Sequence, residues 1–408
     1  MIAVSHPTGN EFVRGWVRHL YEKGKLSRFI TCISADQMEW LITRLPKRVS
    51  GELRRRSFGI PWDIVDTHPL RESMRLIAQK LSLPGLTRHE TGFASVDAVF
   101  RDLDTYAARQ LPSIKNVRAV YCYEDGAEAT FEAAGKAGLL RVYDLPIAYW
   151  KFGRALMREE AARLPNWEPT LVGTRDSQEK LDRKTREFEH ADIVVCPSRF
   201  VLKSLPASAA EKTCIVSEFG SPCMESSSAE VPREQSTLRV LFAGSMTQRK
   251  GLADVFAAFK ILKRSDVELV VLGSPVAPME FYRGEYADFR HEPPRPHAEV
   301  LKLMRSCDVL VLPSILEGRA LVQQEAMSCG LPLIVTANAG GEDLIIEKET
   351  GFLVPIRSPE RIAESIAWMA AHRSQLPEMG ERAKAHAARL TWESYAARIL
   401  KAIESKWL

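Results

Sequence analysis

The amino-acid sequence predicts an α/β protein with two doubly wound domains. Short apolar runs alternate with amphipathic helical patterns from residue 2 to residue 216, and the same alternation restarts at Leu238. Between these parts, residues 220–233 are small, polar and proline-bearing, which is typical of an interdomain linker. Alternating strands and helices favour mostly parallel sheets. We therefore expect domains at residues 1–225 and 226–390, with a ligand-binding cleft between them.

The first domain begins with a strand, a loop of small residues and a helix, which is how a doubly wound sheet starts. No G-x-G-x-x-G follows this strand, which weakens a dinucleotide-binding interpretation. Hydrophobic periodicity predicts strands at 2–5, 29–34, 117–123, 140–143, 191–196 and 214–216, and helices at 11–23, 38–45, 66–81, 96–110, 126–138 and 177–190.

The second domain repeats the pattern. The expected strands are 238–243, 267–273, 308–312, 331–335 and 352–355, and the expected helices are 252–263, 298–305 and 342–346, with another beginning after Gly318. The last fifty residues read as helices that end with residues 392–407.

Composition narrows the class of protein. The net charge of +4 is too small to indicate a general nucleic-acid partner. No window approaches the length of an apolar membrane span, and the seven scattered cysteines are expected to be buried thiols. We expect a cytoplasmic protein. Basic residues cluster in the first domain (Lys47, Arg48, Arg54, Arg55 and Arg56), and either a solvated face or a peripheral contact with an anionic membrane surface would explain them.

Two loops of the second domain suit an anionic ligand. The loop 244–251 joins a strand to a helix, so its amides and the positive helix end face the cleft, and Arg249 and Lys250 add charge. The stretch E-G-R-A-L-V-Q-Q-E places Glu317 and Gly318 at the next such turn, and Glu325 beside the inward face of the helix that follows. An ordinary surface turn and a solvated Glu325 are the alternatives.

Together these motifs resemble a known family. The segments F-A-G-S-M-T-Q-R-K-G, C-D-V-L-V-L-P-S, E-A-M-S-C-G-L-P-L-I-V and A-G-G-E-D-L-I-I-E-K-E-T-G-F-L-V-P follow the order and spacing of the C-terminal half of retaining, nucleotide-sugar-dependent glycosyltransferases of family 4. The resemblance implies the GT-B fold, in which two Rossmann-like domains face a cleft, and a C-terminal helix, here 391–408, that packs back on the first domain. No cofactor is implied, because a nucleoside-diphosphate sugar is the co-substrate.

The resemblance also implies roles for individual residues. Glu325 would accept hydrogen bonds from the ribose, Glu317 would act at the transferred sugar, and Lys250 would pair with the diphosphate. Cations at the leaving phosphate and a carboxylate near the sugar suit a transition state in which the phosphate gains negative charge. The expected donor-binding residues are Ser245, Arg249, Lys250, Gly318, Arg319, Ala320, Leu321 and Glu325, with the backbone amides of residues 319–321 as donors.

This sequence departs from the family pattern at two positions. Ser245 stands where many members have an arginine that completes the phosphate clamp, and Arg249 or Arg319 could supply the missing charge. Asp144 is the best match to a histidine near the donor sugar, with His6 and His297 as other candidates. The expected catalytic residues are therefore Glu317, Lys250 and Asp144.

The acceptor is expected to contact the first domain. Candidate residues are His6, Gly9, Asn10, Tyr149 and Trp150, although an aromatic cluster of this kind is also typical of a hydrophobic core. No metal site is expected. The carboxylates of Asp102-Leu103-Asp104 resemble a D-x-D motif, but a helix would point them to different faces.

The sequence thus predicts a hexosyltransferase that moves a sugar from a nucleotide-sugar donor to a glycan or lipid-linked acceptor, as in surface polysaccharide or glycolipid biosynthesis. Two alternatives stay open. A nucleotide-sugar epimerase of the same fold would act without an acceptor, and a non-catalytic nucleotide-sugar-binding protein would explain Ser245 and the missing histidine.

Overall fold

The computed structural model describes residues 1–36, 44, 54, 56–171, 175–222 and 237–407. Nearly all of the predicted helix at 38–45 lies outside these residues, as do most of the expected linker and the expected boundary at 225/226. Lys47, Arg48 and Arg55 of the basic cluster also lie outside them.

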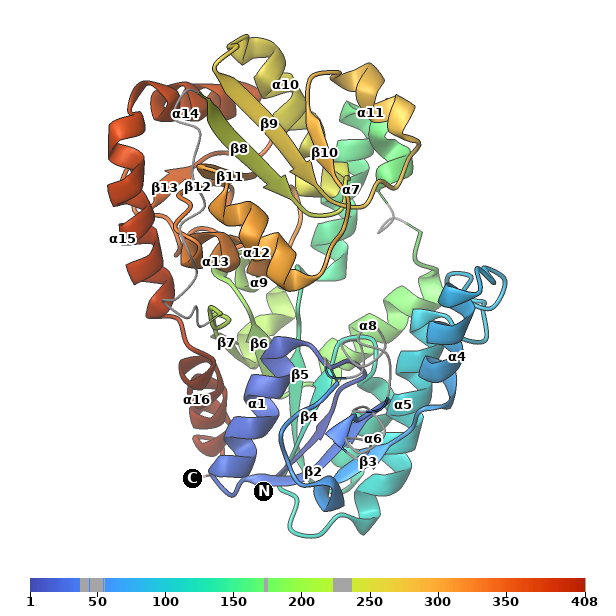
Figure 1. Ribbon diagram of the computed structural model, residues 1–408. Coiled ribbons are helices and arrows are strands. Elements are labelled where there is room, and N and C mark those ends of the chain that lie inside the picture. The colour runs from blue at the N-terminus through green and yellow to red at the C-terminus, as the bar shows by residue number, and fades with distance from the viewer. Residues whose placement is uncertain (37–43, 45–53, 55, 172–174, 223–236, 408) are drawn as a thin grey trace.

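The first domain is a parallel sheet covered by helices on both faces (Figure 1). Its seven strands lie in the order β3-β2-β1-β4-β5-β6-β7. The strands are β1 (Ile2–Ser5), β2 (Leu26–Thr31), β3 (Val65–Thr67), β4 (Ala119–Tyr123), β5 (Leu140–Asp144), β6 (Ile193–Cys196) and β7 (Thr213–Val216). The helices in this part of the chain are α1 (Glu11–Glu22), α4 (Leu70–Lys80), α5 (Val96–Gln110), α6 (Glu128–Lys136), α7 (Trp150–Arg163), α8 (Gln178–His190) and α9 (Arg199–Lys203).

The second domain is a six-stranded parallel sheet in the order β10-β9-β8-β11-β12-β13. Its strands are β8 (Leu238–Ala243), β9 (Val267–Leu272), β10 (Arg290–Glu292), β11 (Val309–Leu312), β12 (Leu333–Val335) and β13 (Gly351–Leu353). The helices are α10 (Leu252–Leu262), α11 (Met279–Glu285), α12 (His297–Arg305), α13 (Leu321–Ser328), α14 (Pro359–Ala371), α15 (Leu376–Ala388) and α16 (Trp392–Glu404). The strand order reverses between β8 and β11, and ligands bind at the carboxyl ends of the strands beside such a switch point.

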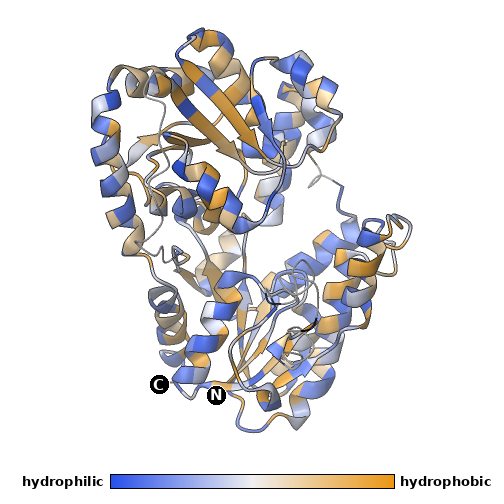
Figure 2. Ribbon diagram, viewed as in Figure 1, coloured by the Kyte–Doolittle hydropathy of each residue, from blue (hydrophilic) through white to orange (hydrophobic). Residues whose placement is uncertain are grey.

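The central strands are largely apolar and the outer helices carry polar faces, as Figure 2 shows for β8, β9 and α15. β8 and β11 are buried along nearly their whole length, as expected for strands covered by helices on both sides. The predicted two-domain α/β architecture is therefore confirmed. Among the described residues, no helix combines the length and apolar composition needed to cross a membrane.

Some elements differ from the sequence predictions. The predicted helix at 66–81 is wrong in its first part, where β3 is followed by Pro69 and α4 begins at Leu70. The ring of Pro69 disfavours helical backbone at the preceding residue. The predicted helix at 342–346 is a series of turns, in which Ile346 N donates to Thr350 Oγ1 at 2.8 Å. The pattern analysis missed β10 and α7.

Each domain contributes apolar residues to the core of the other. Ile315 and Leu316, which follow β11 of the second domain, lie in a core cluster of the first domain with Leu145 and Leu156. In the other direction, Trp167 belongs to the main core cluster of the second domain, although it precedes the linker by more than fifty residues. The interdomain contact is therefore made from both halves of the chain.

The last helix lies against the first domain. In Figure 1, α16 runs beside α1, and the two chain ends lie near each other. Tyr395, Ile399 and Ile403 of α16 belong to the same core cluster as Trp16 and Leu20 of α1. The chain thus returns from the second domain to the first through α15 and α16.

Candidate donor site

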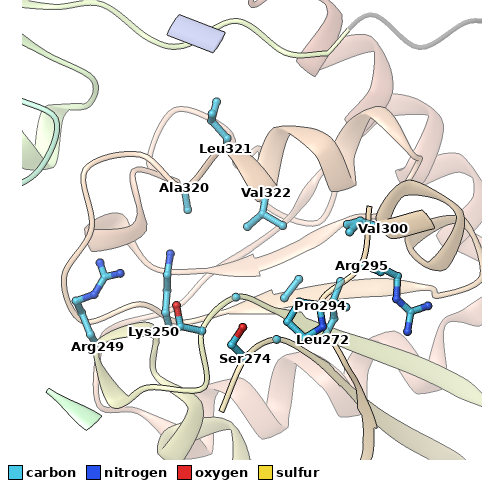
Figure 3. A pocket seen from close by; sticks show the side chains of 14 residues that line it. Arg249, Lys250, Leu272, Ser274, Pro294, Arg295, Val300, Ala320, Leu321 and Val322 are labelled. Carbon is cyan, nitrogen blue, oxygen red and sulfur yellow. The ribbon is translucent and has the colours of Figure 1, made fainter. Parts of the chain in front are cut away.

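A pocket of about 440 Å³ opens at the carboxyl ends of β8 and β9. Its lining comes from the loop after β8, the segment after β10, the side of α12 and the start of α13. Figure 3 shows Arg249 and Lys250 at one end of the pocket, and Pro294, Arg295 and Val300 at the other. The predicted donor residues that line it are Ser245, Arg249, Lys250, Ala320 and Leu321.

Glycines shape the loop between β8 and α10. Gly244 has φ +151° and Gly251 has φ +80°, which are conformations that side-chain-bearing residues rarely adopt. A Cβ on Gly251 would lie 2.2 Å from the Pro313 carbonyl oxygen, so only glycine fits there. The short helix η7 (Gln248–Lys250) between the two glycines carries both cations into the pocket.

The two cations contact Glu317, which follows β11. Arg249 Nη1 lies 2.5 Å from Glu317 Oε1, and Lys250 Nζ contacts Glu317 Oε2. Burial lowers the pKa of Lys250, and Arg249 adds to this shift, whereas the Glu317 carboxylate in direct contact favours the ammonium form. The sequence motif predicted these three residues near one ligand but not their contact with each other.

Glu325 is held by a histidine. His297 Nε2 lies 3.0 Å from Glu325 Oε1. His297 is the first residue of α12, and Glu325 lies in α13. Burial raises the pKa of Glu325 and His297 opposes this shift. The carboxylate is thus partly buried and partnered, as the inward helix position suggested, and His297 stands beside Glu325 in the second domain.

The Arg319 side chain is paired with Asp343 and Gln324. This side chain is fully buried, Nη1 lies 2.8 Å from Asp343 Oδ2, and Nε donates to Gln324 Oε1 at 2.9 Å. The geometry therefore gives no support to Arg319 as the source of the missing charge, which leaves Arg249 as the second cation. The backbone amide of Ala320 is also engaged, since it donates to Ala339 O at 3.3 Å.

Gly318 packs closely against the first domain. A Cβ at Gly318 would lie 1.6 Å from the carbonyl oxygen of Pro146, in the loop after β5. Ser198 Oγ, which follows β6, donates to Gly318 O at 2.6 Å. The predicted residue Asp144 lies just before this contact, at the end of β5, and is 3% exposed. Burial raises the pKa of Asp144 to about 7, with Tyr121 opposing the shift.

Several acceptor candidates are buried in the first domain. The His6 ring is fully buried against Tyr123 and Phe12, and burial lowers its pKa to about 3, so the ring is neutral at physiological pH. Tyr149 is a core residue, and Trp150 Nε1 donates to Thr185 Oγ1 at 3.0 Å.

Gly9 and Asn10 lie nearer the surface. Gly9 O accepts a hydrogen bond from Arg14 at 2.9 Å, and Asn10 is exposed. Among the acceptor candidates, Asn10 is thus exposed and Gly9 and Trp150 are partly exposed, whereas His6 and Tyr149 are buried.

The D-x-D resemblance and one group of possible metal ligands both lie in the first domain. Asp102 Oδ2 lies 2.9 Å from His68 Nε2, whereas Asp104 accepts from the amides at the start of α6, so the two carboxylates face different elements. Within the described part of the chain, the group His89, Glu90 and Asp176 has ligand atoms close together. Lys180 Nζ already lies 3.2 Å from Asp176 Oδ1.

Comparison with known proteins places this site in a family context. Residues 224–386 match the family model described as "Glycosyl transferases group 1". The match lies in the second domain. Two relatives are named D-inositol 3-phosphate glycosyltransferase. The one from Paenarthrobacter aurescens (strain TC1) is 30% identical over 172 residues, which cover 40% of this chain and 42% of the relative. The one from Segniliparus rotundus is 31% identical over 183 residues, which cover 42% and 41%. The chain thus matches about two fifths of the length of these relatives.

Solved structures resemble the whole chain. Sucrose-phosphate synthase from Thermosynechococcus elongatus aligns with a TM-score of 0.65 and 16% identity, covering 100% of this chain and 98% of the other. Anabaena Alr3699/HepE in complex with UDP aligns with a TM-score of 0.61 and 14% identity, covering 99% of each chain. These likenesses concern the fold, and they confirm the predicted GT-B arrangement of two Rossmann-like domains.

Sequence reasoning missed part of the pocket and its support. Pro294, Arg295 and Val300 line the end remote from the cations, and the P-P-R-P run at 293–296 is a signal for a shaped turn there. Gln248 is fully buried beneath the cations, and no pattern in the sequence indicates that burial.

Proposed function

We propose that this protein transfers a sugar from a nucleoside-diphosphate sugar to a hydroxyl group of an acceptor, with retention at the anomeric carbon. The observation that carries the proposal is the group formed by Arg249, Lys250 and Glu317 at one end of an elongated pocket beside the switch point of the second sheet. Cations at one end can bind the diphosphate, and the remaining length can hold the nucleoside.

The proposed transfer needs no separate catalytic acid and base. The bond between the anomeric carbon and the β-phosphate oxygen breaks, the acceptor oxygen bonds to the anomeric carbon, and the acceptor proton goes to the leaving phosphate. Arg249 and Lys250 stabilise the negative charge that develops on the diphosphate. Glu317, released from the two cations when phosphate replaces it, can stabilise the positive charge that develops at the sugar. Glu325 is the proposed acceptor of hydrogen bonds from the ribose.

The names of the relatives guide the choice of substrates. Alr3699/HepE was solved with UDP and with UDP-glucose, and other relatives are named for transfer to D-inositol 3-phosphate. This acceptor differs from the surface polysaccharide expected from the sequence. We therefore include a phosphorylated polyol among the acceptors to be tested, beside glycan and lipid-linked acceptors.

A transfer assay tests the proposal. Purified protein is incubated with UDP-, GDP- and ADP-sugars and with the acceptor panel, and products are analysed by mass spectrometry and by NMR of the new anomeric centre. Sugar transfer with retention supports the proposal. Conversion of the donor without any acceptor would instead identify an epimerase, and donor binding without transfer to acceptor or water would identify a binding protein.

A further inference from the structure

A segment of the first half of the chain contacts the loop between β8 and α10, residues 244–251, which we call the donor loop. Helix α7 begins in the first domain, where Leu156 and Met157 belong to its core. The chain then enters the second domain through η4 (Pro165–Thr170), where the Trp167 ring lies 4.9 Å from Phe281 and 5.8 Å from Tyr282. We call residues 160–170 the cross-domain segment. It is anchored by apolar contacts in both domains.

This segment holds Gln248, the residue directly before Arg249 and Lys250. The Gln248 backbone N–H donates to Thr170 Oγ1 at 3.1 Å, and Thr170 Oγ1 donates to Trp167 O at 2.7 Å. Gln248 Nε2 donates to Glu160 Oε1 and to Asp254 Oδ2, both at 2.7 Å. Gln248 and Glu160 are fully buried and Thr170 is 1% exposed, so water cannot replace these hydrogen bonds.

The carboxylate of Glu160 is itself fixed by charge. Arg163 lies within hydrogen-bond distance on one side, and Arg357 Nε donates to Glu160 Oε2 at 2.7 Å on the other. These donors outweigh burial and lower the pKa of Glu160, so the group is ionised at neutral pH. On the far side of Gln248, its Oε1 accepts from Ala253 N at 2.8 Å in the first turn of α10. Gln248 is thus tied to the cross-domain segment and to α10 together.

We propose that Thr170 and Glu160 are positioning residues for the donor site, acting through Gln248 on Arg249 and Lys250. The two cations follow Gln248 without an intervening residue and lie between two glycines that give the backbone unusual freedom. A site for a diphosphate requires its cations to be held within a fraction of an ångström. The cross-domain segment supplies that constraint from outside the domain that contains the pocket. The effect on donor binding rests on the function proposed above.

Thr170→Val tests the inference, because it keeps the shape of the side chain and removes the hydroxyl that accepts from Gln248 N. Thr170→Ser keeps the hydroxyl and should restore wild-type behaviour. Thr130→Val is the matched control, since Thr130 is also buried and its hydroxyl also donates to a backbone carbonyl, that of Asp104, in the first domain. Thr170→Ala, which cannot clash, is the second variant if Thr170→Val yields little folded protein.

The measurements are UDP binding by calorimetry and hydrogen exchange of peptides that span residues 244–252 in the ligand-free protein. For Thr170→Val we expect UDP to bind about fivefold more weakly and these amides to exchange about fivefold faster, from the loss of one hydrogen bond. Thr130→Val and Thr170→Ser should change either quantity by less than about twofold, whatever they do to the melting temperature.

The inference is overturned if the amides of residues 244–252 in Thr170→Val exchange at the wild-type rate and this variant binds UDP as tightly as Thr130→Val. If the wild-type protein binds no nucleoside diphosphate, the proposed function fails by itself. The exchange measurement then still decides whether Thr170 positions the loop, because it needs no ligand.

Discussion

In this structure Glu317 contacts Arg249 and Lys250, the two cations that would meet a donor phosphate in the proposed function. We predict that Glu317→Gln binds UDP more tightly than the wild type and turns over less donor. Glutamine has nearly the same shape but lacks the charge that competes with phosphate. A donor must displace the carboxylate before the two cations can bind its diphosphate, so removing that charge removes a cost of binding.

The size of the effect follows from burial. The side chains of Glu317, Lys250 and Arg249 are 12%, 13% and 26% exposed. At the effective dielectric constant of such sites, a pair of unit charges in contact interacts by about 4 kcal/mol. Glutamine retains a hydrogen bond and solvent reaches Arg249, so we expect a net gain on the order of 1–2 kcal/mol, or about tenfold in affinity.

Calorimetric titration with UDP at low and at high salt provides the assay, because added salt should reduce the difference. Glu268→Gln is a matched control. Glu268 pairs with Arg239 Nε at 2.8 Å. It lies near the amino end of β9, whereas the pocket lies at the carboxyl end of the same strand. Equal or weaker UDP binding by Glu317→Gln would refute competition between Glu317 and phosphate. Unchanged turnover would refute its role at the transferred sugar.

Two further predictions concern the contact between the domains. Burial raises the pKa of Asp144 to about 7, above the unfolded value of about 4, so the folded state binds the proton more tightly. The stability that this provides is present below about pH 4 and is lost as pH rises to about 7. Relative to wild type, Asp144→Asn should therefore gain on the order of 2–4 kcal/mol of unfolding free energy between pH 4 and pH 8 in urea titrations, and a constant difference would contradict this. Gly318→Ala should lower turnover about tenfold or more, because its Cβ would meet Pro146 O. Gly284→Ala is the control and should have normal turnover, since a Cβ there meets nothing within 4 Å. Equal rates for the two variants would disprove the steric argument.

The sequence was sufficient for the elements that repeat a local pattern. Buried strands such as β8 and β11 are continuous apolar runs, and a glycine-bounded loop after β8 predicts an anion site through backbone geometry alone. Arg249 and Lys250 therefore could be found without a structure. Their pairing with Glu317 could not, because it depends on how two loops from different strands face each other.

The surroundings of other expected site residues depend on tertiary packing. Arg319 follows the motif glycine and carries the right charge, but Asp343, which is distant in sequence, takes its guanidinium. Tyr149 looked like a sugar-binding aromatic, yet it lies in a core that includes Leu316 from the other domain. Amphipathic patterns report that a side chain is buried and do not report which domain buries it.

The donor site depends on both halves of the chain, because each domain contributes residues to the core of the other. Ile315 and Leu316 anchor the chain in the first domain immediately before Glu317, and Gln248 is anchored by the cross-domain segment immediately before Arg249 and Lys250. The carboxylate and the two cations are therefore each fixed within a few bonds of an interdomain contact. The two stretches are also bonded directly to each other, because Ile315 N donates to Arg249 O at 2.9 Å and Arg249 Nη1 donates to Leu316 O at 3.1 Å. Contacts from both halves of the chain therefore hold Glu317 against Arg249 and Lys250.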